Sequence, residues 1–332
     1  QNITLRLKSI KDLFNLSEFE WRALIVCLAP SLDLRYEKIF GYLQDDVTRM
    51  HPSVDLILNL LLPNNLGRLD QIHCFSLRSP LRLHRLILPL EDSGRQVNLL
   101  RQAFQVSPSV VSWLLGDYIP QGKDSCLEFT PTSELEKDEW AVSIFEEENI
   151  PSVDVLNAVH PMLSVYGEDI LQQDMLSRRL SAALEKPWIK LNLPIETNTE
   201  SAIEQLYPAV RDARMLGALL SIQNADVFID RNGCLMTEAF EALRLLNDTI
   251  LLCSKEPFRF ADEMPGNDYP LMHLFKERLS TNERVSLWSS MLEGISNNSE
   301  ISQQTIETLA GQFVLTTGQI VASASTAMSQ AL

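Results

Sequence analysis

The chain has 332 residues, a formal net charge of −16, 45% hydrophobic residues and 22% charged residues. This composition is ordinary for a soluble globular protein, and the length favours two domains that each bury a core. No apolar run reaches the length of a membrane span and no N-terminal signal peptide is recognisable, so we expect a cytoplasmic protein that does not engage a membrane.

The charge is unevenly distributed along the chain. Residues 1–100 hold 12 basic and 11 acidic side chains, whereas the remainder holds 16 basic and 33 acidic ones. This asymmetry supports a two-domain division and argues against nucleic acid as a ligand of the second part, because phosphate contacts require a basic face. The five cysteines and five histidines are scattered, which indicates reduced thiols and no metal site.

The first hundred residues predict helices followed by a hairpin. After a lead-in of uncertain structure (1–15), Ser17 and Glu20 have capping-box spacing at the start of a helix. Two more helices follow, and after them a short helix is expected near 69–75. The apolar positions of these predicted helices are Tyr36, Ile39, Phe40, Leu43 and Val47, and then Val54, Ile57, Leu58 and Leu61.

A strand-like run covers Leu81–Leu90, and Ser107 with Pro108 opens another helix. Three helices and a hairpin-like pair are the winged-helix order. The hairpin region holds a basic cluster, whose members are Arg78, Arg82, His84 and Arg85. DNA phosphates are one interpretation of this cluster, but a solvated hairpin face or a surface docking an acidic neighbour is favoured.

Residues 120–150 read as an acidic linker. Trp140, Ile144 and Phe145 fall near helical spacing, which predicts an exposed helix in part of it. A helix that binds a partner is the alternative, but a solvated spacer is the preferred interpretation.

Strands and helices alternate from about Ile150, which argues for a parallel sheet covered on both faces. Strands are expected at 163–166, 188–193, 219–222, 250–253 and 271–275. Helices are expected at 170–184, at 200–216 (broken or started at Pro208) and at 237–246. A helical tail follows at 282–292, 303–313 and 316–328.

The first strand and helix of this region have the context of a P-loop, whose pattern is GxxxxGK[ST]. Gly167 fits the first glycine, but Gln172 replaces the second glycine, Gln173 the lysine and Asp174 the Ser/Thr. A side chain at 172 crowds the phosphate, and residue 173 is neutral. Asp174 could touch a metal, yet with Glu168 and Asp169 it would place three carboxylates beside a polyphosphate, each like-charge contact costing about 1–4 kcal/mol.

Two later segments show matching losses. Leu216–Asp226 resembles the strand of P-loop ATPases that ends in Asp-Glu, but Gln223 and Asn224 take the places of these acids. Leu315–Ala324 resembles a lid segment of pattern G-x-x-R, with Val321 in the place of the arginine. Ser254 stands where a polar residue would sense the γ-phosphate, although a hydroxyl that ends a strand is common. Arginine-finger or packing roles are both open for Arg259, Arg278 and Arg284.

The order and spacing of these segments resemble an AAA+ module, and Leu16–Arg49 resembles the variant winged-helix domain of certain bacterial AAA+ ATPases. Such proteins carry two AAA+ modules, the first degenerate and the second intact. One branch is the ATPase of extracellular contractile injection systems. Together with the start at Gln1 rather than Met, the resemblance implies that this chain is the N-terminal part of a longer protein. We expect the chain to end just after the lid of the first module.

The resemblance implies a multidomain fold class: a mainly helical winged-helix-like N-terminal domain, then an α/β P-loop-type (AAA+) parallel sheet with a C-terminal helical lid. The expected divisions are a winged-helix-like domain (1–119), an acidic linker (120–150), a degenerate AAA+ α/β subdomain (151–280) and the helical lid (281–332).

The expected function is a non-catalytic region that scaffolds a homo-oligomeric ring and docks protein cargo or injection-particle components. ATP and Mg²⁺ are expected only in a downstream module, so no cofactor is expected for this chain. The full-length parent is expected to be an ATPase. The alternatives are an active ATPase with a divergent nucleotide site, for which Lys186 and Lys190 look poorly placed, and a winged-helix DNA-binding regulator.

Overall fold

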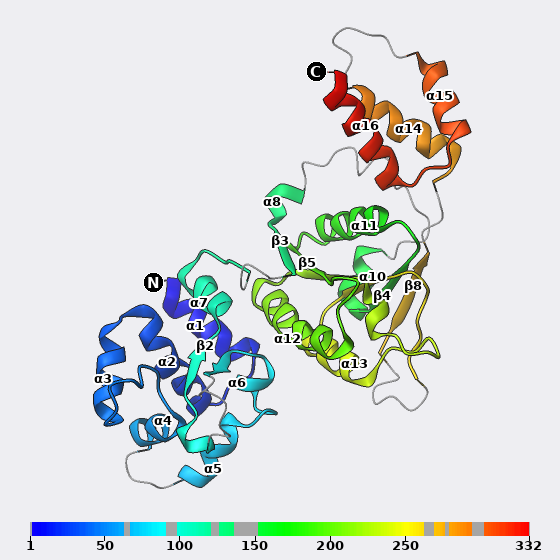
Figure 1. Ribbon diagram of the computed structural model, residues 1–332. Helices are drawn as coiled ribbons and strands as arrows, with labels where there is room; N and C mark the ends of the chain where they lie inside the picture. The colour runs from blue at the N-terminus through cyan, green and yellow to red at the C-terminus, as the bar shows by residue number, and fades with distance from the viewer. Residues whose placement is uncertain are drawn as a thin grey trace. The chain divides into compact units, whose positions relative to one another are not determined.

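The computed structural model describes residues 2–62, 67–90, 98–120, 126–135, 152–261, 269–275, 279–293 and 302–331. The chain divides into two compact units (Figure 1). Unit 1 comprises residues 1–125 and 207–215, and unit 2 comprises residues 126–206 and 216–332. No helix in the described ranges is long and apolar enough to cross a membrane.

Unit 1 consists of helices and one small antiparallel sheet. Its helices are α1 (Asn2–Leu13), α2 (Glu18–Leu32), α3 (Arg35–Leu43), α4 (Val54–Leu61), α5 (Arg68–Ile72), α6 (Pro80–Leu83) and α7 (Pro108–Leu115), with short 3-10 helices η1 (His73–Phe75) and η2 (Leu99–Arg101). Strands β1 (Ile87–Pro89) and β2 (Phe104–Val106) pair with each other. Helices followed by a hairpin pair are the order that the sequence predicted.

The start of α2 follows directly from its sequence. The Ser17 hydroxyl accepts a hydrogen bond from the Glu20 backbone N–H at 3.2 Å, and the Glu20 carboxylate accepts one from the Ser17 N–H at 2.9 Å. The predicted capping box is therefore confirmed, and two backbone donors at the helix end are satisfied. Ala23, Leu24 and Leu28 of this helix enter the core of unit 1.

Two local expectations in unit 1 are wrong or incomplete. The lead-in forms helix α1, whose Ile10 is fully buried. The strand-like run 81–90 is a strand only from Ile87, because Pro80 at the first helical position starts the short helix α6. Arg85 then adopts a left-handed backbone with φ of 51°, which separates α6 from β1.

Helix α3 is confirmed, but its apolar face is not buried. Phe40 is 4% exposed, whereas Tyr36, Ile39 and Leu43 are 42–49% exposed. Val47 lies beyond the end of the helix and is 85% exposed. Helical periodicity thus predicted the element correctly while giving no information about which apolar side chains find a packing partner.

A buried ion pair completes unit 1 from a distant part of the sequence. Arg211 and Asp212 are adjacent residues whose side chains are both fully buried, and the Arg211 Nε donates to Asp212 Oδ1 at 2.7 Å. The Arg211 guanidinium also donates to the hydroxyls of Ser107 and Ser109 and to the carbonyl of Arg85. These bonds satisfy charges whose burial without partners would cost several kcal/mol.

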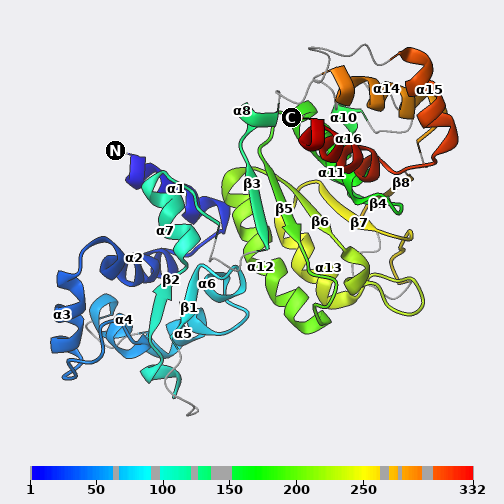
Figure 2. The same ribbon diagram turned by 45° about the horizontal axis from the view of Figure 1, so that its top comes forward.

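Unit 2 contains a six-stranded sheet in the order β3-β5-β6-β7-β4-β8 (Figure 2). The strands are β3 (Leu127–Thr130), β4 (Met162–Tyr166), β5 (Trp188–Asn192), β6 (Leu219–Gln223), β7 (Ile250–Ser254) and β8 (Leu271–Phe275). All neighbours are parallel except β3, which pairs antiparallel with β5. The five strands predicted from the sequence are confirmed, and β3 is an additional edge strand within the segment expected to be a linker.

Helices cover both faces of this sheet (Figure 1). They are α10 (Val153–Val159) and α11 (Ile170–Ala183), and on the other face α12 (Thr199–Leu216) and α13 (Thr237–Leu243). A short helix, α8 (Thr132–Leu135), follows β3, and the 3-10 helices η3 (Ala225–Phe228) and η4 (Arg244–Leu246) follow β6 and α13. The expected acidic helix near Trp140 lies outside the described residues.

Pro208 neither breaks nor starts a helix, contrary to the sequence-based expectation, since α12 runs through it. A proline inside a helix removes one backbone hydrogen bond and costs about 3 kcal/mol. The next turn buries Ala209, Val210 and Ala213 almost completely, and this burial offsets the cost.

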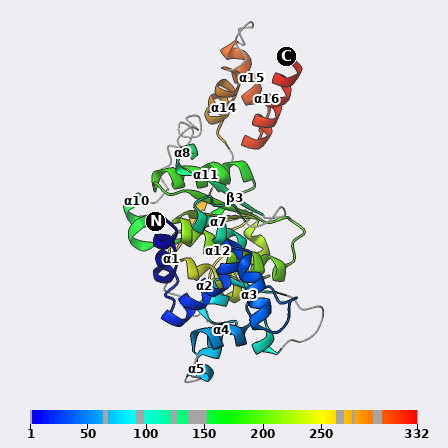
Figure 3. The same cartoon turned by 90° about the vertical axis from the view of Figure 1, so that its left-hand side faces the viewer.

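The lid is a bundle of α14 (Thr281–Glu293), α15 (Gln303–Gln312) and α16 (Thr317–Ala331), drawn side by side in Figure 3. Its core includes Leu287, Ile306 and Ile320, and Met175 of α11 packs into the same cluster. The helical tail expected from the sequence is confirmed.

We predict that replacing Arg211 by methionine destabilises unit 1 by about 3–5 kcal/mol, because Asp212 is left as an uncompensated buried charge. Chemical denaturation followed by circular dichroism measures the loss. Arg101→Ala removes an exposed arginine from η2 and serves as the control. Equal stability of the two variants would contradict the assignment.

We also predict that unit 1 loses stability as the pH falls from 7 to 4. Burial, with help from Arg214 and Arg211, lowers the pKa of His84 from 6.5 to about 4. Between these values the unfolded chain binds a proton that the folded one does not, which removes up to about 3 kcal/mol. The melting temperature of His84→Gln should depend less on pH than that of the wild type, whereas His73→Gln, at an exposed position, should retain the full dependence.

Candidate functional site

The residues singled out in the sequence meet at the carboxyl edge of the sheet. Gly167 follows β4, Gln223 ends β6, and Ser254 ends β7. Strand β4 lies between β7 and β8 in the sheet, so the connection from β7 to β8 passes from one side of β4 to the other. Ligands of open α/β sheets bind at such a switch point, so this edge is the candidate site.

The loop after β4 is shorter than a phosphate-binding loop. Helix α11 begins at Ile170, so Gln172 and Gln173 lie in its first turn and are buried. Gly167 has φ of 151°, a conformation that side chains rarely allow. The retained glycine is therefore explained by its backbone geometry, and only residues 167–169 remain to form the loop.

Asp169 occupies the N-terminus of α11. Its Oδ1 accepts hydrogen bonds from the backbone N–H groups of Leu171 at 3.1 Å and Gln172 at 3.4 Å. These are the donors that a helix N-terminus offers to a phosphate. From the sequence we expected Asp169 only to repel a polyphosphate, whereas in the structure it caps α11.

Gln173 stands at the lysine position and closes the loop from inside. Its Nε2 donates to the carbonyl of Gly167 at 3.1 Å and to the carbonyl of Ser254 at 3.0 Å. The Gly167 N–H donates to the same Ser254 carbonyl at 3.1 Å. The side chain therefore joins the loop to β7, and its amide protons are directed to carbonyl oxygens.

Asp174, at the Ser/Thr position, is bonded to two side chains. Lys190 of β5 donates from Nζ to Asp174 Oδ2 at 2.5 Å, and Gln223 donates from Nε2 to Asp174 Oδ1 at 2.6 Å. Burial raises the pKa of Asp174, while the Lys190 ammonium and the Gln223 amide act in the opposite direction. The expectation that Lys190 is poorly placed is wrong, since its ammonium lies within the candidate site.

This arrangement does not fit a magnesium ion. Mg²⁺ requires oxygen ligands in octahedral geometry. Here the amide nitrogen of Gln223 faces the carboxylate, and an ammonium already compensates its charge. Among the described residues, Gln223 Oε1 is a buried oxygen without a hydrogen-bond partner, but one neutral oxygen is not a metal site. No described group of three His, Cys, Asp or Glu residues is placed to hold a metal.

The remaining predicted residues make structural contacts. Asn224 has a left-handed backbone and donates from Nδ2 to the Leu193 carbonyl at 2.6 Å, which links the ends of β6 and β5. The Ser254 hydroxyl donates to the Glu256 carbonyl at 2.7 Å. Val321 is half-buried in α16.

The lid reaches the loop through its backbone. The N–H of Thr317, the first residue of α16, donates to Asp169 Oδ2 at 2.6 Å. Arg284 is buried in the lid and donates to the carbonyls of Ala310 and Leu279, so its guanidinium links α14 to α15. Arg259 is exposed, and Arg278 lies outside the described residues.

The basic cluster of unit 1 does not form a phosphate-binding face. His84 is buried beside Phe14, with 4.8 Å between the ring centroids. The Arg82 guanidinium lies over Phe104, and that of Arg85 over Tyr207, at 5.0 and 5.3 Å from the ring centroids. Arg78 is the exposed member, so three of the four side chains serve the packing of unit 1.

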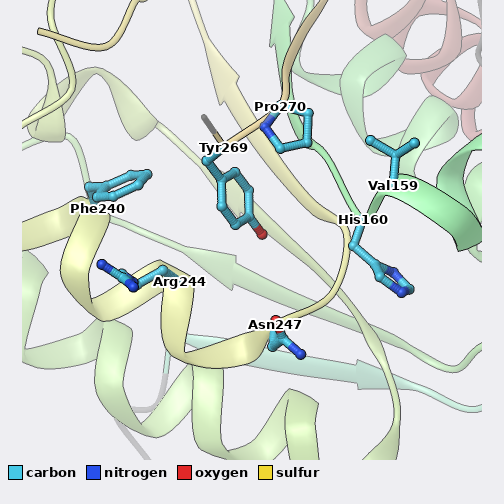
Figure 4. A pocket seen from close by; sticks show the side chains of 7 residues that line it. All are labelled: Val159, His160, Phe240, Arg244, Asn247, Tyr269 and Pro270. Atoms are coloured by element: carbon cyan, nitrogen blue, oxygen red, sulfur yellow. The ribbon is translucent and has the colours of Figure 1, made fainter. Parts of the chain in front are cut away.

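A separate cavity of about 400 Å³ lies at the opposite, amino edge of the sheet (Figure 4). Its lining consists of Val159, His160, Phe240, Arg244, Asn247, Tyr269 and Pro270. His160 Nδ1 lies 3.2 Å from Asp248 Oδ1, and Lys186 binds the other oxygen of Asp248. The sequence analysis did not predict this cavity, because its lining residues come from segments far apart in the sequence and no motif marks them.

The comparisons with known proteins agree with part of this picture. Residues 1–122 match the family model described as "Winged helix domain, variant". None of the curated proteins compared with the chain matches it. A structure from a study of katanin self-assembly is 11% identical over 58% of this chain and 71% of its own, with a TM-score of 0.39. The structure of Rhizobiales Trip13 is 12% identical over 56% and 80%, with a TM-score of 0.30.

At these TM-scores neither likeness supports a conclusion about function. The family match and the chain's own architecture confirm the predicted fold class. A helical winged-helix region is followed by a sheet that is parallel apart from its edge strand β3, with helices on both faces, and by a helical bundle.

We predict that Lys190→Met costs about 3 kcal/mol of stability at neutral pH, because Asp174 loses its compensating charge. The loss should shrink as the pH falls and Asp174 takes up a proton. Denaturant unfolding of Lys190→Met, Asp174→Asn and the double variant measures the coupling, with the exposed Lys255→Met as control. Additive effects of the two substitutions would rule out the pair.

Proposed function

We propose that this chain is the catalytically silent region of an AAA+ ATPase, a variant winged-helix domain joined to a degenerate AAA+ module. The observation that carries the proposal is the contact of Lys190 and Gln223 with Asp174. A catalytic Mg²⁺ would need oxygen ligands from these positions, including a hydroxyl group in its coordination shell. They offer an ammonium, an amide nitrogen and a carboxylate that already satisfy one another.

The phosphate side of the site supports the same proposal. A working loop directs backbone N–H groups and a lysine toward the β- and γ-phosphates. In this chain Asp169 accepts the two N–H groups of α11, and Gln173 donates to the chain's own carbonyls. A polyphosphate would have to displace these bonds and approach an acidic loop.

An active ATPase with a divergent site is the weaker alternative. Lys190 is the cation that contacts Asp174 at the candidate site, and its ammonium is already paired with that carboxylate. Catalysis would also require a residue that activates water, and Asn224, at the position of the glutamate, binds the Leu193 carbonyl. A DNA-binding regulator is weaker still, because Arg82, His84 and Arg85 pack within unit 1.

In this proposal the chain scaffolds a ring of identical subunits and docks partners or cargo for an active ATPase module further along the full-length protein. Loading of toxin or assembly of a contractile injection particle is the setting that the sequence resemblance suggests. Selection for the fold without selection for hydrolysis would leave a retained sheet and lid whose site residues bond to one another.

We predict that the wild-type chain binds Mg-ATP no more tightly than about 1 mM, equivalent to about 4 kcal/mol, and does not hydrolyse it. Isothermal titration calorimetry with ATP, with and without Mg²⁺, measures the affinity, and a phosphate-release assay measures turnover. Micromolar binding that requires Mg²⁺ would overturn the proposal, because neither the metal nor the triphosphate has ligands in the arrangement described.

A further inference from the structure

Two helix N-termini meet at one side chain in unit 2. Asp169 Oδ1 accepts from the first turn of α11, and Asp169 Oδ2 accepts from the Thr317 N–H at the start of α16. These helices have 14 and 15 residues. One carboxylate thus receives three backbone hydrogen bonds from two helices that are 148 residues apart at the point of contact.

Two helix N-termini that meet at one point both favour a negative charge there. Each helix N-terminus carries roughly half a positive elementary charge and leaves unsatisfied N–H groups. At α16 the Thr316 hydroxyl accepts from the Gln319 N–H, and the Gln319 side chain accepts from the Thr316 N–H. This capping box leaves the Thr317 N–H for Asp169. The carboxylate therefore completes the caps of both helices.

The bridge lies beside an apolar contact between the same elements. Met175 of α11 is buried in the lid core with Ile320 and Ala324 of α16, and Leu171 packs against that core. Thr317 is only 1% exposed. The lid is thus held on α11 by packing along the helices and by a charged hydrogen bond at their N-terminal ends.

We propose that Asp169 is an internal anionic ligand, which takes the place of a nucleotide phosphate at the meeting point of α11 and α16 and holds the lid in one position. This inference rests on the proposed function, because a lid fixed by the chain itself does not respond to a nucleotide. The lid would then present a constant surface to partners, independent of the ATP cycle of a neighbouring module.

Asp169→Asn is the most informative variant. Asparagine caps a helix about as well as aspartate, so its oxygen can still accept from α11. Its second terminal atom is an amide nitrogen, which cannot accept from Thr317. Hydrogen exchange of the full chain, followed at single amides by NMR, should show at least about fivefold faster exchange at Thr317 with Leu171 and Gln172 little changed.

Asp169→Ala should accelerate exchange at all three amides. Glu241→Gln removes an equal charge from an exposed position on α13 and should leave all of them unchanged. Unchanged exchange at Thr317 in Asp169→Asn would overturn the inference. This measurement needs no nucleotide, so its failure is distinct from a failure of the proposed function, which only tight ATP binding would show.

Discussion

The contact between Lys190 and Asp174 decides what the carboxyl edge of the sheet can do. Both side chains are largely buried, and an isolated charge in such a place would cost several kcal/mol. Each therefore needs the other, and Gln223 supplies a second donor to the same carboxylate. A divalent cation would have to break this pair and place its own charge beside an ammonium. The site is electrostatically complete without a ligand.

The surrounding elements follow the same rule. Gln173 directs its amide to two carbonyls, Asn224 binds the end of β5, and the Ser254 hydroxyl binds the Glu256 carbonyl. Gln223 Oε1 and the Thr317 hydroxyl are buried polar atoms near this edge that have no hydrogen-bond partner in the described structure. The polar groups at the carboxyl edge thus connect strands, loops and helix ends of unit 2 to one another.

Much of this architecture could be predicted from the sequence, because alternating apolar strands and helices carry strong local signals. The capping box at Ser17 is one example, and the P-loop-like frame at Gly167 is another. Local patterns could not place Lys190 at the site. Lys190 lies on β5 and reaches Asp174 of α11 only because of the order and register of the strands in the sheet. The same limit applies to Asp169, whose role depends on a lid 148 residues away. The expectation for Pro208 was wrong because the burial of its neighbours outweighs the cost of a proline inside a helix.

The division of α12 between the two units has a practical consequence. Ser107 and Ser109 belong to the segment matched by the winged-helix family, while their guanidinium partner, Arg211, comes from much later in the chain. A fragment trimmed at the end of the family match would expose these hydroxyls and the apolar surface that Met215 covers. A fragment defined by sequence homology alone would therefore have an incomplete core. Such a fragment would be a poor reagent for mapping partners.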